Sequence, residues 1–285
     1  MMMQKYYRFA GLEFLVEIPE SVAYSKEWHL ASFRADTAED PHRFRFERVE
    51  ELTVPTGECY VTQPNFRLYA LPSGHCRYIG GEHAYIRAEH HGKDHWVEVK
   101  RNPHMDHIAV KTVLESMEIE HLIARNHGFV FHCSYIDHNG KAILFTAPSE
   151  TGKSTQADLW HQYRGTEIIN GDRAAIRLAD GVLLAEGIPF AGSSQYCKNR
   201  SLPIEAIVYL GQAPVTTIRK LRGYEAFSKI WEGVSVNTWD KTDMELVSQV
   251  VQKVAEQVPI FHMPCTPDED AVIALEEALR KQVSP

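Results

Sequence analysis

The segment at 141–164 constrains the fold most, because its pattern changes abruptly from strand to helix. The apolar run "KAILFTA" at 141–147 is followed by a short loop that ends in GKST at 152–155. Beyond the loop, apolar side chains recur with helical spacing at Ala157, Leu159, Trp160 and Tyr163. In a strand–loop–helix of this kind, successive backbone N–H groups can form a concavity that binds anions. The segment therefore predicts a phosphate-binding loop in an α/β domain.

The residues at the end of this loop match the pattern G-x-x-x-x-G-K-[ST]. In that pattern the lysine reaches the β- and γ-phosphates and the hydroxyl coordinates Mg²⁺. We therefore expect Lys153 to bind phosphate and Ser154 to bind Mg²⁺. The residues expected to contact the nucleotide are Ser149, Glu150, Thr151, Gly152, Lys153, Ser154 and Thr155. The alternative is a chance match at a helix start, where Ser and Thr act only as capping residues.

Two positions of the loop depart from the pattern. Ala147 replaces the first glycine, at a strand end where a negative φ would suffice. Glu150 places a carboxylate near the expected triphosphate, which would cost on the order of 1–4 kcal/mol at effective dielectric constants of about 80 to 20. Glu150 is therefore expected to point outward, or to help hold the metal or the acceptor.

Asp172 and His132 are the other candidate site residues. Asp172 follows the apolar strand predicted at 166–170, where a Walker-B-type carboxylate holds Mg²⁺. The alternative is a simple turn aspartate, because Asn-Gly-Asp is a strong turn signal. His132 lies within a strand predicted at 129–137, and the residues by themselves favour a structural role for it.

The chain divides into two halves of different pattern. Apolar and polar residues alternate in the first half, which predicts antiparallel strands at 11–19, 42–49, 66–74, 84–90 and 92–100. The second half alternates strands with helices. We expect a mostly antiparallel β module at 1–103 and an α/β catalytic domain with a mixed sheet at 104–285.

Local signals locate the elements of the second half. A helix is expected at 108–128, ending at Gly128. The strands at 129–137 and 141–147 are expected to form a hairpin through Asn139-Gly140. Further strands are predicted at 166–170, 174–179, 181–190, 205–211 and 216–221, and helices at 223–232, 241–257 and 267–281.

Composition excludes several classes of protein. A net charge of −8 argues against a nucleic-acid-binding protein. The five cysteines are scattered and odd in number, which is typical of a reducing cytoplasm rather than a disulfide framework. Because no apolar run approaches about 18 residues, no membrane span is expected. We expect a cytoplasmic protein.

Two groups of charged or polar residues permit alternative interpretations. Seven histidines fall between His75 and His107, which suggests a metal site, but His90 and His91 would point to opposite faces of a strand. The favoured interpretation is that these histidines are polar residues on the surface of the strands. Arg173, Lys198 and Arg200 could pair with phosphate or substrate charge, or lie on a solvated loop.

The stretch "FHCSYIDHNGKAILFTAPSETGKST" followed by "TEIINGDRAAIR" resembles the kinase domain of the HPr kinase/phosphorylase family, within the phosphoenolpyruvate carboxykinase-like P-loop superfamily. The similarity covers about 129–210. The chain resembles still more closely the HPr-kinase-like proteins that are encoded in bacterial peptide-modification clusters. The resemblance implies a P-loop kinase domain that uses ATP and Mg²⁺, with a serine of a peptide or small protein as acceptor. It also implies that a homo-oligomer could form.

The resemblance assigns roles to individual residues. His132 would lie near the acceptor or the γ-phosphate, and Asp172 would match the second aspartate of a paired acidic motif. The first aspartate of that pair, the usual proton acceptor, is replaced here by Gly171. The predicted catalytic residues are thus Asp172, His132 and Lys153, with Ser154 and Asp172 as metal ligands. A nucleotide-binding regulatory protein with weak or no transfer activity, and a small-metabolite kinase, are the alternatives.

Overall fold

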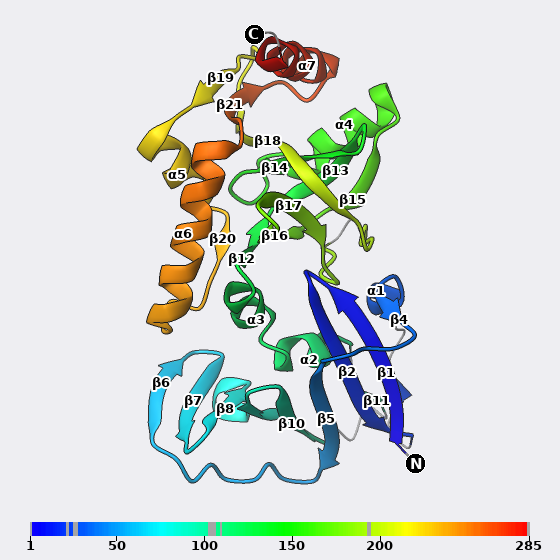
Figure 1. The fold of residues 1–285 in the computed structure, drawn as a ribbon, viewed down its shortest axis with the longest axis vertical. Helices are drawn as coiled ribbons and strands as arrows, with labels where there is room; N and C mark the ends of the chain where they lie inside the picture. The colour runs from blue at the N-terminus through cyan, green and yellow to red at the C-terminus, as the bar shows by residue number, and fades with distance from the viewer. Residues whose placement is uncertain are drawn as a thin grey trace. The chain divides into compact units, whose positions relative to one another are not determined.

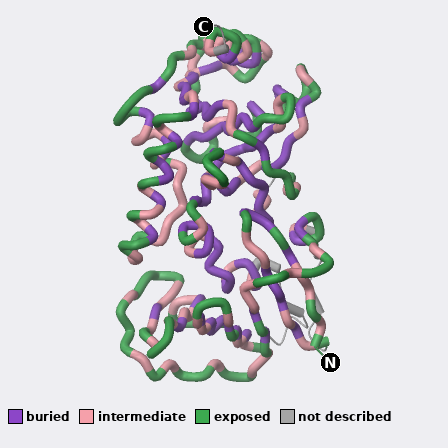
Figure 2. Tube along the Cα trace, viewed as in Figure 1, coloured by how far each residue is buried: buried purple, intermediate pink, exposed green. Residues whose placement is uncertain are grey.

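The computed structural model describes residues 2–20, 23–24, 28–101, 107–108, 110–192 and 195–283, and separates into two compact units, Met1–Ile119 and Glu120–Pro285 (Figure 1). The expected boundary at 103–104 lies outside the described residues. Each unit has its own buried strands, which Figure 2 shows in purple. None of the described helices is both long and apolar enough to cross a membrane.

Unit 1 is built around one large β-sheet with the strand order β4-β1-β2-β5-β10-β9-β8-β7-β6. Its strands are β1 (Met2–Phe9), β2 (Leu12–Pro19), β4 (Arg34–Ala35), β5 (His42–Val49), β6 (Cys59–Gln63), β7 (Phe66–Leu71), β8 (Gly74–Ile79), β9 (Ile86–His91) and β10 (Asp94–Lys100). Smaller elements are β3 (Ala23–Tyr24), α1 (Trp28–Ala31), the 3₁₀ helix Gly81–His83, β11 (His107–Ile108) and α2 (Val110–Ser116).

The sheet of unit 1 is mostly antiparallel, as the alternating pattern predicts. The exception is β5, which pairs in parallel with both β2 and β10. Aromatic side chains fill the core, and Phe14, Phe33 and Phe44 are completely buried. Strands β1, β6 and β8 are not among the predicted elements.

Unit 2 is an α/β unit with a mixed sheet. Its helices are α3 (Ile119–Arg125), α4 (Lys153–Arg164), α5 (Gly223–Trp231), α6 (Lys241–Gln257) and α7 (Glu269–Val283). Its strands are β12 (Gly128–His132), β13 (Ser134–His138), β14 (Lys141–Thr146), β15 (Glu167–Asn170), β16 (Arg173–Ala179), β17 (Val182–Gly187), β18 (Ser201–Gln212), β19 (Arg219–Leu221), β20 (Val234–Ser235) and β21 (Ile260–Cys265).

Strand β18 connects the two parts of this sheet. Its first residues pair with β17, and its later residues pair in parallel with β14 and β21. Helices α4 and α7 pack on one face of the strands β14, β18 and β21, where Phe145, Trp160 and Leu275 are buried together. Residues of α5 and α6, including Ile230 and Val251, belong to a second buried cluster with the strands.

Several predicted elements of unit 2 are confirmed. The hairpin β13–β14 closes through Asn139 and Gly140, whose φ angles of 54° and 80° are those the Asn-Gly turn requires. Helices α5, α6 and α7 occupy the predicted segments. Within α4, Ala157, Leu159 and Trp160 are buried as predicted, whereas Tyr163 is exposed.

Two predicted elements are wrong. The helix expected at 108–128 is broken into α2 and α3, because Glu118 adopts φ 49° and buries its carboxylate. Gly128 begins β12 rather than ending a helix, and a Cβ at that position would lie 2.6 Å from the Ile176 carbonyl oxygen. The strand expected at 129–137 is two strands, because the chain passes from one part of the sheet to the other at Cys133.

Candidate functional site

The candidate site lies where parallel strands of unit 2 end. Strand β13 is antiparallel to both β14 and β15, so β14 and β15 run parallel to each other. Strands β18 and β21 run in the same direction as β14. The carboxyl ends of these four strands therefore share one edge of the sheet, which is where α/β proteins commonly bind ligands. The loop before α4, Asp172 and the end of β21 all lie at this edge.

The backbone of the loop explains how its unusual residues fit. Gly152, the residue before α4, has φ 113°, a conformation that favours glycine. Glu150 also has a positive φ of 64°, whereas Ala147 does not have a positive φ. Alanine can therefore replace the first glycine without backbone strain. The left-handed conformation at Glu150 costs about 1–2 kcal/mol for a residue with a Cβ.

Lys153 is the first residue of α4 and is only 8% exposed. Its Nζ donates hydrogen bonds to the carbonyl oxygens of Ala147 at 3.1 Å and Pro148 at 3.4 Å, so the ammonium group closes the loop. Burial lowers the pKa of Lys153, and the charge of Asp172 opposes this shift. The lysine and the aspartate therefore influence each other electrostatically across the sheet edge.

The loop also offers anion donors at the start of α4. The first N–H groups of a helix have no carbonyl partner within the helix. Among the described residues, no acceptor is found for the amides of Lys153, Ser154 and Thr155, whereas the Gln156 amide donates to the Gly152 oxygen. Ser154 and Thr155 are exposed, and their hydroxyls lie in the first turn of the helix.

The remaining loop residues are accessible to a ligand. Ser149 and Glu150 are exposed, and Thr151 is half-buried. The Thr151 hydroxyl donates to the Ser149 oxygen at 3.5 Å, and the Gln212 amide donates to the Glu150 oxygen at 3.4 Å. The residues predicted to contact nucleotide thus form one continuous segment, which consists of the loop and the first residues of α4.

His132 and Asp172 meet at the same edge. Their Nε2 and Oδ1 atoms are 3.4 Å apart, with side chains 37% and 29% exposed. The hydrogen bond from His132 lowers the pKa of Asp172, against the effect of burial, and the charges of Arg173 and Lys153 act in the same direction. Asp172 is therefore ionised at neutral pH. The structure brings the three predicted catalytic residues into one electrostatic neighbourhood.

Asn170, which the sequence did not single out, holds Asp172 in place. It is completely buried, and its Oδ1 accepts hydrogen bonds from the amides of Asp172 at 2.9 Å and Arg173 at 3.0 Å. Its Nδ2 donates to the oxygens of Ile188 and Phe190. The turn signal Asn-Gly-Asp pointed to local side-chain bonding, but the partners at 188 and 190 are not visible in the sequence.

The three cations considered in the sequence analysis have carboxylate partners. Arg173 lies 3.3 Å from Asp172 and 3.8 Å from Glu120. Lys198 pairs with Glu167 at 2.7 Å. Arg200 pairs with Asp137 and Glu167. Because Glu167 begins β15 and Asn170 ends it, Lys198 and Arg200 lie toward the opposite end of that strand. In the structure these two side chains therefore pair with carboxylates away from Asp172, and a role in binding phosphate or substrate stays a prediction.

A cavity of about 570 Å³ opens beside the loop. Its lining includes Thr151, Gly152 and Gln156 from the loop and α4, and Gln212, Cys265 and Thr266 from the ends of β18 and β21. The Gln156 amide donates to the Cys265 sulfur at 3.3 Å, and the Gln156 Oε1 atom is buried without a hydrogen bond. The cavity is large enough for part of a nucleotide and carries polar groups for recognition.

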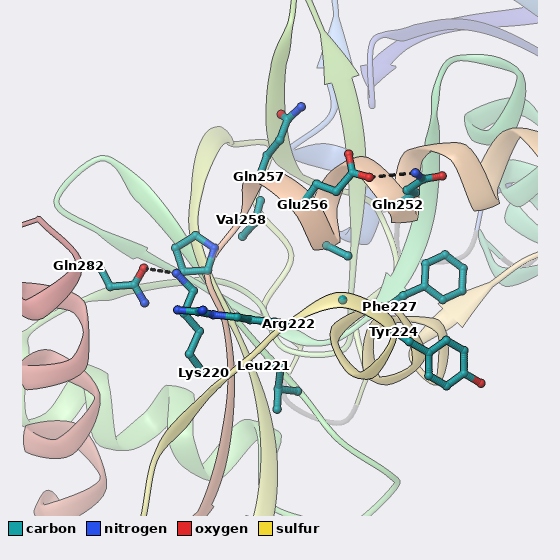
Figure 3. Close-up of a pocket in the computed structure, with 13 residues that line it drawn as sticks. Lys220, Leu221, Arg222, Tyr224, Phe227, Gln252, Glu256, Gln257, Val258 and Gln282 are labelled. Atoms are coloured by element: carbon teal, nitrogen blue, oxygen red, sulfur yellow. Dashed lines mark hydrogen bonds between the residues drawn. The ribbon is translucent and has the colours of Figure 1, made fainter.

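A second cavity, of about 690 Å³, is lined by Lys220, Leu221, Arg222, Tyr224, Phe227 and Gln282 among other residues (Figure 3). Leu221 pairs with Ile260, the first residue of β21. This cavity therefore lies at the amino end of the parallel strands, away from Lys153 and Asp172. No predicted site residue lines it.

The residues at the carboxyl edge fit a nucleotide with Mg²⁺. Unpaired amides and Lys153 suit phosphate, while the Ser154 hydroxyl and the Asp172 carboxylate are oxygen ligands of the kind Mg²⁺ prefers. No protein-family profile and no curated protein matches the chain. Among solved structures, the Hpr(Ser) kinase/phosphatase from Coxiella burnetii is similar over 54% of this chain and 89% of that chain, with 12% identity and a TM-score of 0.33. The proposal below therefore depends on the residues of the site.

Proposed function

We propose that the chain is an ATP- and Mg²⁺-dependent phosphotransferase that transfers the γ-phosphate to a hydroxyl group. The observation that carries this proposal is the convergence of Lys153, Asp172 and His132 at the edge where the loop meets α4. A cation for the phosphates, an ionised carboxylate and an imidazole are the groups that phosphoryl transfer needs close together. The sequence resemblance supports a serine of a peptide or small protein as the acceptor.

Each residue has a distinct role in this proposal. The amides of Lys153, Ser154 and Thr155 and the Lys153 ammonium bind phosphate oxygens, with the other predicted contact residues, Ser149 to Gly152, around them. Lys153 must exchange its bonds to the Ala147 and Pro148 oxygens for bonds to phosphate. Ser154 and Asp172 would hold Mg²⁺, which neutralises charge that develops on the phosphate oxygens. His132 orients Asp172, and its partly exposed side chain would meet the acceptor hydroxyl.

A second candidate is a nucleotide-binding regulatory protein with weak transfer activity. It is favoured by Gly171, which offers no carboxylate beside Asp172, and by Glu150, an acidic residue among those that line the cavity beside the loop. Because phosphoryl transfer depends mainly on positioning and charge neutralisation, one carboxylate can support the reaction. We therefore place the transferase first.

The experiment combines γ-labelled ATP, Mg²⁺ and cell-lysate fractions separated by mass. We expect label in peptides or small proteins with the wild-type chain, and about 10²–10³-fold slower labelling with Asp172→Asn. Lys141→Ala serves as the matched control, because Lys141 is exposed at the opposite end of the strand that leads into the loop. Label in metabolites would indicate a small-molecule kinase. Bound ATP without any transfer would support the regulatory protein.

A further inference from the structure

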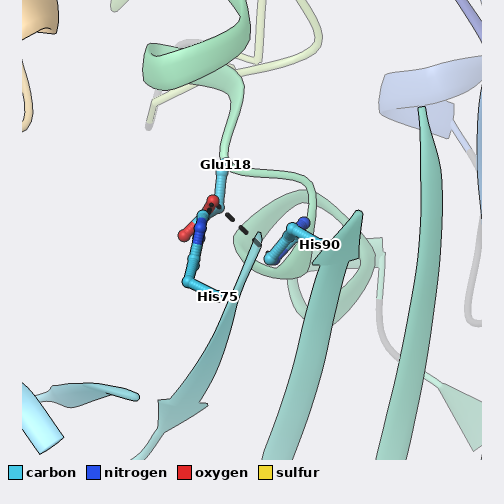
Figure 4. Close-up of side chains that lie close together, drawn as sticks. All are labelled: His75, His90 and Glu118. Atoms are coloured by element: carbon cyan, nitrogen blue, oxygen red, sulfur yellow. Dashed lines mark hydrogen bonds and ion pairs between the residues drawn. The ribbon is translucent and has the colours of Figure 1, made fainter. Parts of the chain in front are cut away.

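A cluster of histidines in unit 1 lies outside the proposed kinase site. His75 and His90 are directly opposite each other in the pairing of β8 with β9. Glu118, in the turn after α2, has its carboxylate next to His75, and Figure 4 shows a dashed line that joins this pair to His90. His90 and Glu118 are 7% and 3% exposed, so these two residues are not polar surface groups. The surface interpretation of the histidines is wrong for His90 and also for His95, which is 2% exposed. His104 and the side chain of His107 lie outside the described residues.

The two oxygens of Glu118 have different partners. Oε1 accepts a hydrogen bond from Arg77 at 3.2 Å. Oε2 lies 2.8 Å from the Nε2 of His75 and 3.7 Å from the Nε2 of His90. A buried carboxylate is costly unless cations or a metal compensate it. Arg77 thus orients the carboxylate, and two imidazole nitrogens converge on its other oxygen.

A second layer of histidines orients His90. The Nδ1 atoms of His90 and His95 are 2.9 Å apart, and the Nε2 of His95 is 3.1 Å from the Nδ1 of His42. The two hydrogen bonds can run in either direction along these three rings, and in the arrangement that suits metal binding His90 donates from Nδ1 to His95, which donates from Nε2 to His42. In that arrangement the Nε2 of His90 presents a lone pair toward Glu118. Metal-binding histidines are typically oriented by such a bond at the other ring nitrogen.

We propose that His75, His90 and Glu118 bind a divalent transition-metal ion, for which Zn²⁺ is the best match. Their ligand atoms all lie within 4.8 Å of one another. Zinc bonds of about 2.0–2.2 Å in tetrahedral geometry separate neighbouring ligand atoms by about 3.3–3.6 Å. The observed separations of 2.8 and 3.7 Å lie on either side of that range. Three protein ligands leave a fourth position for water, and the His75 side chain, 17% exposed, lies on the side open to solvent.

The other histidine–carboxylate cluster shows what distinguishes this site. Asp243 is held by His121 at 2.8 Å and by Arg125 at 2.9 Å. Asp240 accepts hydrogen bonds from two backbone amides at the start of α6. That cluster offers one imidazole. Its Asp243 carboxylate binds Arg125, and its Asp240 carboxylate caps helix α6. Two imidazoles and a carboxylate oxygen converge only on Glu118 among the described residues.

The test measures Zn²⁺ binding by the full-length chain after chelator treatment, by calorimetry and by metal analysis. We expect one equivalent of Zn²⁺ per chain, with affinity reduced at least about 100-fold in His75→Ala and in His90→Ala. His83→Ala, which changes an exposed histidine of the same unit, should bind like the wild type. Mg²⁺ should not compete, because it avoids nitrogen ligands.

Loss of Zn²⁺ binding can be distinguished from a loss of folding. His75 lies at the rim of the site, so its alanine variant should retain the wild-type circular dichroism spectrum. The melting temperature of the wild type, but not of His75→Ala, should rise with Zn²⁺. A wild type that binds no Zn²⁺, or variants that bind it as tightly as the wild type, would overturn the proposal. Because the site is in unit 1, this result is independent of kinase activity.

Discussion

The two histidine–carboxylate sites proposed for catalysis and for zinc binding use the same residue types in opposite environments. At the sheet edge of unit 2, His132 and Asp172 are 37% and 29% exposed beside an open loop. In unit 1, the side chains of His75 and Glu118 are 17% and 2% exposed, and Arg77 and further histidines surround them. A carboxylate that must meet successive substrates has to remain accessible, whereas one that holds a resident ion can be enclosed. The difference in burial therefore agrees with the two proposals, substrate turnover at Asp172 and a resident ion at Glu118.

The largest effect that would test this comparison is on stability. Replacing Glu118 by Gln leaves Arg77 without its buried charge partner, which we expect to lower the free energy of unfolding by about 3–5 kcal/mol. Asp172→Asn should lower it by less than about 1 kcal/mol, because that carboxylate is partly solvated. Chemical denaturation of both variants measures the contrast, and equal losses would show that the two environments do not differ as described.

For transfer activity the order of the two variants should be reversed, so that Asp172→Asn lowers the rate more than Glu118→Gln does. Asp172→Asn removes the ionised carboxylate beside Lys153, so the transfer rate should fall about 10²–10³-fold while ATP binding without Mg²⁺ changes little. The matched control is Asp180→Asn, which alters an exposed turn aspartate of the same unit. Initial rates with the labelled acceptor provide the measurement. A rate within threefold of the wild type would remove Asp172 from the mechanism.

Asn170 tests whether Asp172 depends on its support. Asn170→Ala leaves the amides of Asp172 and Arg173 without their acceptor and should cost about 2 kcal/mol of stability. Transfer activity and Mg²⁺ affinity should both fall, because Asn170 no longer holds the Asp172 carboxylate in position. Asn170→Asp keeps the acceptor oxygen but replaces the Nδ2 donor by an oxygen that faces the carbonyl oxygens of Ile188 and Phe190, so it should cost more stability than alanine. If Asn170→Ala keeps wild-type transfer activity and Mg²⁺ affinity, the positioning role of Asn170 is wrong.

The dependence of nucleotide affinity on pH should reveal the coupling between Lys153 and Asp172. Burial lowers the pKa of Lys153 and Asp172 raises it, so ATP affinity should decline as alkaline pH deprotonates the lysine. Asp172→Asn removes the opposing charge, which lowers the pKa of Lys153 further. The alkaline decline should therefore begin at a lower pH in the variant. Affinity profiles that superimpose, after scaling, would show that the two groups are not coupled.

The smallest effect is expected at Glu150. Glu150→Gly should change stability by about 0–1 kcal/mol, since relief of the left-handed strain is offset by the entropy of glycine in the unfolded chain. ATP affinity should rise a few-fold, because a nearby negative charge is removed. Glu150→Ala removes the charge but keeps the strain. Similar affinity gains in both variants would assign the effect to charge, whereas no gain would show that the carboxylate points away from the phosphates.

The sequence predicted those features that local chemistry determines. The turn at Asn139-Gly140, helices α5 to α7 and the loop before α4 each carry their own signal within a few residues. The break at Cys133 could not be predicted, because β12 and β13 choose partners far along the chain. The break at Glu118 depends on His75 and Arg77, about forty positions earlier. The buried support of Asn170 has the same non-local origin.

The same distinction between local and non-local determinants applies to the candidate sites. Lys153 and Asp172 could be identified because a motif and a spacing mark them. Their common location at one edge depends on strand directions that only the sheet topology supplies. The histidine cluster was visible as a concentration of one residue type. Which of its members converge depends on the register of β8 with β9, where His75 faces His90.

The most direct test of the central claim is calorimetric titration of the full-length chain with ATP and Mg²⁺. The wild type and Lys141→Ala should bind one nucleotide per chain with similar affinity, and Lys153→Ala should bind at least about 100-fold more weakly. A wild type that binds no nucleotide, or a Lys153→Ala variant that binds as tightly as the wild type, would contradict the assignment of a phosphate-binding loop to this turn.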